Sequence, residues 1–306
     1  NEKGGILNDP VLLRIAEDEF WFSLSDTDLM LWLQGVNISK KYDVTIDEID
    51  VCPVQIQGPL SENLMAKLAG EELRDIPFYG LMETKIEGVD TVISQTGFTG
   101  EKGYEIYVRD AHENAEIVWN AVLEAGEEFG LMVIAPAHHR RIAAGILSWG
   151  QDMDFETSPF QVNLYYQVPR NKEADYIGKN ELERQRAIID GGEFPFKMRM
   201  VGLTFGGKQI TDYAPDFWLI ADTEGNDMGY ITSPWWSPEL DTNIALGWVP
   251  WTSSEIGTKL QVRLPDEYSE SSGVPVEGEI VDVPFRESVN PNKREVQKAK
   301  GLDYAD

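Results

Sequence analysis

The chain has 306 residues, of which 42% are hydrophobic and 10% aromatic, and this composition excludes a disordered protein and predicts two or three packed domains. Its net charge of −27 repels phosphate backbones and anionic lipids, which excludes nucleic acids and membrane surfaces as partners. No apolar run is long enough to cross a bilayer, and a single cysteine, Cys52, excludes an intrachain disulfide.

The cysteine content and the first residues add two further expectations. Cys52 stands beside Pro53 in an apolar run, so we expect an inert core residue in a reducing compartment, and we predict a cytoplasmic protein. The chain opens at Asn1 without a methionine or a signal peptide and runs directly into two glycines, as if inside a domain. We therefore expect a further segment to precede Asn1 in the complete protein.

The first 190 residues mix strand and helix patterns, which predicts an α/β portion. The expected strands are residues 10–15, 20–24, 52–57, 91–95 and 104–108. The expected helices begin at Asp26, Ser61, Asp110 and Ala137. The first should end near Gly35, the third should carry a capping box of Asp110 and Glu113 and stop at Gly130, and the fourth should run to about Leu147.

After Gly191 and Gly192 the pattern changes to short β-rich runs separated by turn residues, without a helix between them. These runs are residues 200–205, 217–221, 228–232, 244–249, 259–264 and 277–283. The pattern predicts a small β-barrel or sandwich. We therefore divide the chain into an α/β portion at residues 1–197, a barrel at residues 198–289 and a loosely ordered tail at residues 290–306.

Several common site motifs are absent from the sequence. It contains no phosphate-binding loop ending in Gly-Lys-Ser/Thr, no dinucleotide fingerprint after a strand and no Cys/His spacing suited to zinc. His112, His138 and His139 are the three histidines, and two adjacent histidines cannot face the same way on a helix. We therefore predict no metal site.

Glu105 is the most informative charged residue. The glycine-rich residues 95–103 lead into its strand, on which Tyr104 and Ile106 point to the opposite face. A carboxylate on an otherwise apolar strand is costly unless a hydrogen-bond donor faces it. The periodicity leaves two alternatives open: a carboxylate that binds a partner, or a glutamate on the solvated face of a sheet.

Residues 96–106 read TGFTGEKGYEI and closely resemble the signature of the glycine-cleavage T-protein (aminomethyltransferase) superfamily. Further matches follow in the order of the family, at residues 1–9, 57–59, 141–145, 175–179, 200–203, 231–233, 237–238 and 244–247. The resemblance spans nearly the whole chain. It implies an α+β fold in which two intertwined α/β domains and a small C-terminal β-barrel form a ring around a central channel, with the N-terminal part missing from this chain.

The resemblance also implies tetrahydrofolate as cofactor, with its pterin deep in the channel and its glutamate tail outward. Glu105 would hold the amidine-like edge of the pterin by paired, charge-assisted hydrogen bonds. Ser25 and Asp26, at the end of the second strand, would contact the pterin, and Phe98 would stack on a ring where the family usually has tyrosine. Arg141 would line the folate site, with a surface ion pair as the alternative.

Asn8 occupies the catalytic position at which amine-handling members of the family carry an aspartate beside folate N5. An amide neither takes up nor releases a proton, so Asn8 can orient the pterin but cannot serve as acid or base. This departure disfavours glycine cleavage. Residues 8–13 and 20–26 resemble instead the demethylase branch of the family, closest to the dimethylsulfoniopropionate demethylases and next to the aryl O-demethylases that act on vanillate-like compounds.

The leaving group favours the sulfonium donor, because a neutral sulfide leaves without protonation, whereas a phenolate needs a general acid that we do not find. Aromatic faces attract a sulfonium. Four tryptophans are expected near the channel, Trp21, Trp149, Trp235 and Trp236, and we choose Trp149 as the substrate contact. The favoured function is methyl transfer from dimethylsulfoniopropionate to tetrahydrofolate, giving 5-methyltetrahydrofolate and methylmercaptopropionate.

Three other functions stay open at this point. They are O-demethylation of vanillate-like methoxybenzoates, aminomethyl transfer in glycine cleavage, and folate binding without catalysis. All of them need only small-molecule partners, namely folate and a one-carbon donor. The sequence does not predict an oligomeric state.

Overall fold

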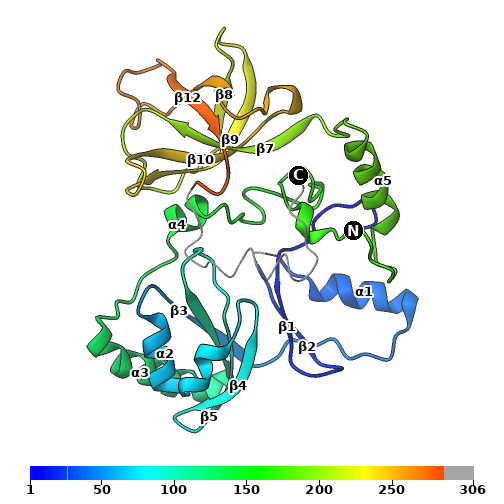
Figure 1. Cartoon of the computed structure of the whole chain (residues 1–306), viewed down its shortest axis with the longest axis vertical. Coiled ribbons are helices and arrows are strands. Elements are labelled where there is room, and N and C mark those ends of the chain that lie inside the picture. Colours follow the sequence, from blue (N-terminus) through cyan, green and yellow to red (C-terminus); the bar gives the residue numbers. More distant parts are fainter. Residues whose placement is uncertain (26, 286–306) are drawn as a thin grey trace.

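The structure is a computed structural model and describes residues 1–25 and 27–285. Three groups of elements surround the middle of the molecule: a four-stranded sheet with two helices, a two-stranded ribbon with helices near it, and a closed six-stranded barrel (Figure 1). This arrangement confirms the predicted α+β class with a C-terminal barrel. Within the described residues, no helix combines the length and the apolar character needed to span a bilayer.

The N-terminal ribbon consists of β1 (Val11–Arg14) and β2 (Phe20–Ser23), and α1 (Met30–Lys40) follows it. Leu13 and Trp21 are paired across the ribbon and pack against Tyr107 of the four-stranded sheet. The helix continues past Gly35, where the sequence predicted its end, because a glycine inside a helix costs only about 1 kcal/mol relative to alanine. It ends at Lys40, and the next residue, Lys41, has a left-handed backbone (φ 55°).

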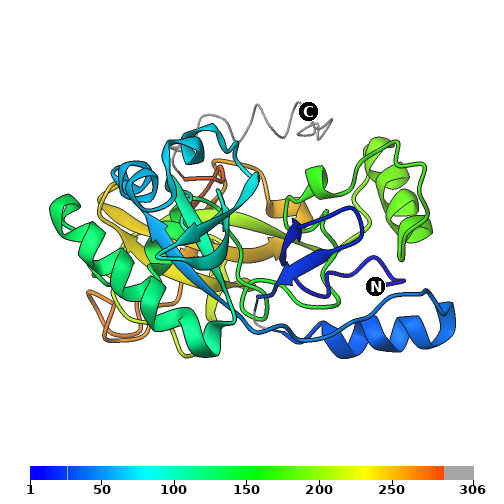
Figure 2. The same ribbon diagram turned by 90° about the horizontal axis from the view of Figure 1, so that it is seen from below.

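The four-stranded antiparallel sheet has the order β3-β6-β5-β4. Its strands are β3 (Val51–Gln57), β4 (Leu81–Ile86), β5 (Val89–Ser94) and β6 (Gly103–Arg109), and its helices are α2 (Ser61–Ala69) and α3 (Ala111–Gly126). Tyr104, Ile106 and Val108 of β6 are buried in one core with residues of α2 and α3. Alternation along the strand therefore places Glu105 and Tyr107 on the other face, where Tyr107 packs against the ribbon. The ribbon lies on the side of the sheet away from α2 and α3 (Figures 1 and 2).

Two local predictions in this part are wrong. Asp110 precedes α3 but makes no side-chain cap, because its backbone is left-handed (φ 49°) and not in the extended conformation that brings a side chain over the first turn. Cys52 is exposed and not in the core. It lies on β3, which is an edge strand of the sheet, so its apolar neighbours in sequence do not imply burial.

Between the sheet and the barrel, the chain forms α4 (His138–Ala143), an irregular segment and α5 (Lys179–Asp190). Helix α4 is shorter than predicted. Gly145 adopts a left-handed backbone (φ 68°), and the N–H of Ile146 returns to the carbonyl of Arg141, which closes the helix in the manner of a glycine C-cap.

The C-terminal barrel closes in the order β10-β7-β12-β11-β8-β9. Its strands are β7 (Met198–Phe205), β8 (Trp218–Ala221), β9 (Asp227–Ser237), β10 (Thr242–Pro250), β11 (Lys259–Val262) and β12 (Val276–Val281). Each of them overlaps one of the six runs that the sequence predicted. Alternate residues point inward and fill the barrel with an apolar core.

Candidate active site

Glu105 lies in the middle of β6, on the sheet face that α2 and α3 leave uncovered. It is partly exposed, and its neighbours across the strands are Gln55 and Ser94. One carboxylate oxygen, Oε2, accepts hydrogen bonds from the Thr96 hydroxyl and from the Tyr107 hydroxyl, the latter at 3.1 Å. The other oxygen, Oε1, has no hydrogen-bond partner among the residues described. The carboxylate is therefore held on one side and available on the other.

Two hydroxyl groups thus fix the orientation of this carboxylate. Burial and the adjacent Glu105 raise the pKa of Tyr107, against opposing hydrogen bonds from Ser23 and Ser94, so its phenol stays protonated and donates. Ser94 and Thr96 are linked at 2.5 Å between their hydroxyl oxygens. Neither Tyr107 nor Thr96 was predicted from the sequence as a partner of Glu105. Tyr107 could have been found, since it follows Glu105 by two residues and must share its face.

Asn8 is held by residues at the end of the ribbon. Its Oδ1 accepts from the backbone N–H and the hydroxyl of Ser25, at 3.3 and 3.0 Å, and its Nδ2 donates to the carbonyl and hydroxyl of Thr27, at 2.9 and 3.3 Å. Both ends of the amide are used, so its orientation is fixed. The structure brings Asn8 and Ser25 into contact, whereas Asp26 lies outside the described residues.

This geometry selects an amide at position 8. In an Asn8→Asp variant a carboxylate oxygen would face the Thr27 carbonyl in place of a donor, so we expect the free energy of unfolding to fall by about 1–3 kcal/mol at pH 7.5. The same contact raises the pKa of the introduced carboxyl, so part of the loss should disappear as pH falls and the carboxyl protonates. Urea denaturation at pH 7.5 and 5.5 measures this. Asn8→Ala is the control, and an equal pH response in both variants would contradict the assignment.

Trp149 joins the same region from the segment that follows α4. Its indole N–H donates to the carbonyl of Ile6 at 3.0 Å, two residues before Asn8. The ring is half-buried against the apolar cluster between α4 and the barrel.

Phe98 lies in the glycine-rich turn after β5 and is 39% exposed, which leaves its ring available for stacking. No group of three or more His, Cys, Asp or Glu side chains in the described part of the chain is placed to hold a metal ion.

Arg141 has a different environment from the one predicted. It is 1% exposed and forms an ion pair with Asp152 at 2.6 Å, while its other terminal nitrogen donates to the Ser233 hydroxyl at 2.8 Å. The surface ion pair considered from sequence is therefore wrong, because the pair is buried. Protein atoms enclose the guanidinium, so a ligand cannot contact it in this arrangement, and we assign it a structural role.

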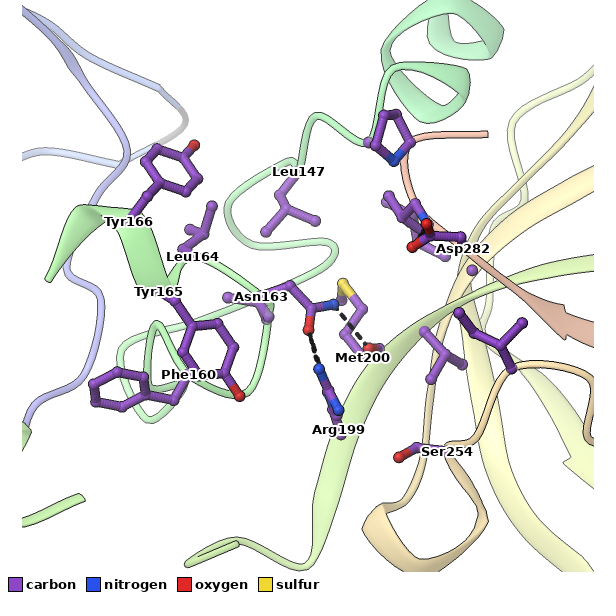
Figure 3. A pocket seen from close by; sticks show the side chains of 18 of the residues that line it. Leu147, Phe160, Asn163, Leu164, Tyr165, Tyr166, Arg199, Met200, Ser254 and Asp282 are labelled. Atoms are coloured by element: carbon purple, nitrogen blue, oxygen red, sulfur yellow. Dashed lines mark hydrogen bonds between the residues drawn. The ribbon is translucent and has the colours of Figure 1, made fainter. Parts of the chain in front are cut away.

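A cavity of 1240 Å³ lies between the barrel, α5 and the irregular segment before α5 (Figure 3). Gly100 of the glycine-rich turn and Leu147, two residues before Trp149, contribute to its wall. None of the site residues predicted from sequence lines it. The cavity is therefore adjacent to the region around Glu105 and Asn8 and distinct from it.

Comparisons with known proteins place the chain in a family. Residues 1–172 match the model of the GCVT N-terminal domain, and residues 199–285 match that of the glycine cleavage T-protein C-terminal barrel domain. A dimethylsulfoniopropionate demethylase of Ruegeria pomeroyi is 35% identical over 276 residues, which cover 87% of this chain and 70% of that protein. An aminomethyltransferase of Clostridium botulinum is 31% identical over 273 residues, or 86% of this chain and 70% of that one.

The fold has a counterpart among solved structures. The crystal structure of the glycine cleavage system aminomethyltransferase T from Bartonella henselae superposes with a TM-score of 0.71 over 94% of this chain and 74% of its own, at 23% identity. The two domain models together cover most of the chain in the order expected from its sequence motifs. The chain therefore belongs to the glycine cleavage T-protein family.

Proposed function

We propose that this protein transfers a methyl group from dimethylsulfoniopropionate to tetrahydrofolate. The observation that carries the proposal is the Glu105 carboxylate, with Oε2 held by Thr96 and Tyr107 and Oε1 available on the open face of the sheet. The name of the Ruegeria pomeroyi relative supports the choice of donor. Membership of the family supports an enzyme of one-carbon transfer.

The residues around Glu105 fit a reduced pterin. The pterin presents two adjacent N–H donors along one edge, and a carboxylate accepts such a pair through both oxygens. Oε2 already accepts two hydroxyl protons, but the Thr96 hydroxyl can donate to Ser94 instead, at 2.5 Å, which makes room on Oε2 for a ligand donor. Gln55, across the strand from Glu105, is exposed on the same face and offers a further amide.

When bound, tetrahydrofolate supplies N5 as the nucleophile that accepts the methyl group. Glu105 then binds and orients the pterin. Asn8, whose amide is engaged by Ser25 and Thr27, holds these two residues in place and takes no part in proton transfer. A sulfonium donor needs no acid, because its carbon–sulfur bond breaks to leave a neutral sulfide as the bond from the methyl carbon to N5 forms. The proton that N5 carried is released to water. Trp149 offers an aromatic face to the sulfonium charge.

The same residues argue against two alternatives. Glycine cleavage needs proton transfer beside N5, and the Asn8 amide cannot perform it. An aryl methyl ether needs a general acid for its phenolate. Tyr107 is the phenol beside Glu105, but it already donates to that carboxylate and its raised pKa makes it a poor acid.

The test is to incubate the protein with tetrahydrofolate and either dimethylsulfoniopropionate or vanillate, and to identify the folate product by mass spectrometry. We expect a methyl group on N5 with the sulfonium donor and none with vanillate. Turnover of vanillate but not of the sulfonium would overturn the proposed donor. A methylene bridge formed from an aminomethyl donor would indicate the aminomethyltransferase activity, and tight binding without product from any donor would indicate a folate-binding protein.

Tyr107 is expected to act as a positioning residue for Glu105. A Tyr107→Phe variant loses one neutral hydrogen bond to the carboxylate, worth about 1 kcal/mol, so its Kd for tetrahydrofolate should rise roughly fivefold. The rate at saturating folate should change little. Titration calorimetry under nitrogen measures the Kd, and Tyr42→Phe, at an exposed position after α1, is the control. Unchanged affinity in Tyr107→Phe would exclude this role.

A further inference from the structure

The cavity of 1240 Å³ is lined by both apolar and cationic side chains, and Figure 3 shows Leu147, Leu164, Met200 and Arg199 among them. Leu147, Leu164 and Met200 contribute apolar atoms, and Arg186 and Arg199 contribute guanidinium groups. Figure 3 shows the hydroxyl of Tyr165 directed into the pocket on the side of Arg199. The environment of this phenol includes both arginines, each of which lowers its pKa against the larger effect of burial. The two positive charges therefore act on the same part of the cavity.

These two arginines differ from most other described arginines, because neither forms an ion pair with a carboxylate of residues 1–25 or 27–285. Seven of the described arginines form ion pairs: Arg74, Arg109, Arg140, Arg141, Arg170, Arg184 and Arg263. Three described arginines do not, and two of these three line this cavity; the third is Arg14, on the ribbon. Acidic residues outnumber basic ones by 53 to 26, so carboxylates are abundant. Unpaired guanidinium groups facing one cavity are therefore informative.

Neutral groups hold both arginines in place. Arg186 donates through one terminal nitrogen to the carbonyls of Tyr165 and Val168 and lies 4.9 Å from the ring centre of Phe160. Arg199 donates to Asn163 Oδ1 at 2.7 and 3.2 Å and lies 5.2 Å from the ring centre of Trp251. Each guanidinium retains N–H groups that have no hydrogen-bond partner among the described residues. The contacts named above hold both side chains in position, so that binding a ligand costs little side-chain entropy.

Other charged groups border the same space. Asp190 is engaged by Arg170 through two hydrogen bonds, at 2.6 and 2.9 Å. Burial, and after it the charge of Arg170, lower the pKa of Arg186, while the carboxylate of Asp190 acts in the opposite direction. Glu255 and Asp282 are exposed and belong to the barrel side. Asp190 therefore contacts Arg170 and acts on Arg186 only from a longer distance, and no described carboxylate forms an ion pair with Arg186 or Arg199.

We propose that this cavity binds the carboxylates of an elongated organic anion, with Arg186 and Arg199 as its charge partners and the apolar lining residues as the contact for its hydrocarbon or aryl part. Guanidinium groups match carboxylates in geometry, and the low polarity of the surroundings strengthens the attraction. Two sources share this chemistry: the γ-linked glutamate tail of a folate, and a separate small polycarboxylate. Gly100, in the turn before the strand of Glu105, and Leu147, two residues before Trp149, are part of the cavity wall. The first source rests on the proposed function, and the second does not.

The test uses p-aminobenzoyl-tri-γ-glutamate, which has the carboxylates and the aryl group but no pterin. We expect calorimetric binding to the protein that weakens about tenfold or more in Arg199→Gln and in Arg186→Gln, and that also weakens with added salt. Arg184→Gln is the matched control, because Arg184 lies on α5 but is paired with Glu181 outside the cavity. Circular dichroism checks that the variants are folded. If Arg186→Gln fails to fold, Arg199→Gln decides the test.

The result also distinguishes the two sources and separates this site from the pterin site. Tighter binding of the triglutamate than of the monoglutamate form of tetrahydrofolate, abolished in Arg199→Gln, identifies the folate tail as the ligand. Equal binding of both forms, with the pterin-free probe still bound, identifies a separate polycarboxylate. Probe binding should persist in Glu105→Gln. No binding of the probe, equal competition by inorganic phosphate, or an equal loss in Arg184→Gln would overturn the proposal.

Discussion

A Glu105→Gln variant is expected to bind tetrahydrofolate roughly 100-fold more weakly than the wild-type protein. The substitution removes the negative charge and places an amide N–H where the pterin also presents N–H donors, so one charge-assisted hydrogen bond is lost and the other is weakened. The hydroxyls of Thr96 and Tyr107 add to the effect, because they are directed at Oε2 and can restrict the amide to the wrong orientation. Titration calorimetry with tetrahydrofolate under nitrogen measures the loss.

The control for this variant is Glu124→Gln. Glu124 is exposed on α3, on the far side of the sheet from Glu105, and should tolerate the change without loss of folate affinity. Equal affinity in Glu105→Gln and the wild-type protein would remove the basis of the proposed function. Because the test concerns the pterin, it does not depend on the identity of the methyl donor.

An Asp152→Ala variant is expected to lose about 3–5 kcal/mol of unfolding free energy, because it leaves the Arg141 charge buried without a partner. The side chains of Arg141 and Asp152 are 1% and 0% exposed. Asp152 also accepts from the hydroxyls of Thr232 and Ser233, at 2.6 and 2.5 Å, and from the N–H of Ser148 at 2.8 Å. The carboxylate thus connects α4 and the following loop with barrel strand β9. Urea denaturation followed by tryptophan fluorescence measures the change.

An exposed ion pair provides the comparison. Arg263 and Asp227 are 2.7 Å apart, but their side chains are 44% and 53% exposed, so Asp227→Asn should cost less than about 1 kcal/mol. If Asp152→Ala also costs less than about 1 kcal/mol, the buried pair does not have the structural role assigned to it. Such a result would return Arg141 to consideration as a ligand contact.

The sequence by itself determined the class of fold and the face of its strand on which Glu105 lies. The six short β-rich runs have no helices between them. Alternation every two residues makes only one face of each strand apolar, and such strands bury that face by closing around a common core, which predicts a barrel. The same alternation places Glu105 opposite Tyr104 and Ile106, and both of these neighbours are fully buried. These features are local, since strand period and turn residues depend on a few neighbouring positions. Local sequence patterns did not correctly predict the ends of α1 and α4 or the exposure of Cys52.

Only the tertiary structure decided how the charged and polar residues are used. Arg141 finds its main partners 11 and 92 residues away, Asn8 depends on Ser25 and Thr27 beyond the ribbon, and Arg186 and Arg199 share a cavity formed by three separate segments. No sequence pattern encodes such meetings, because hydrogen bonds and ion pairs between distant segments depend on how whole elements pack. The role of each arginine depends on its surroundings. A buried arginine that is paired with a carboxylate stabilises the fold, whereas an arginine that lines a cavity without such a pair remains available to a ligand.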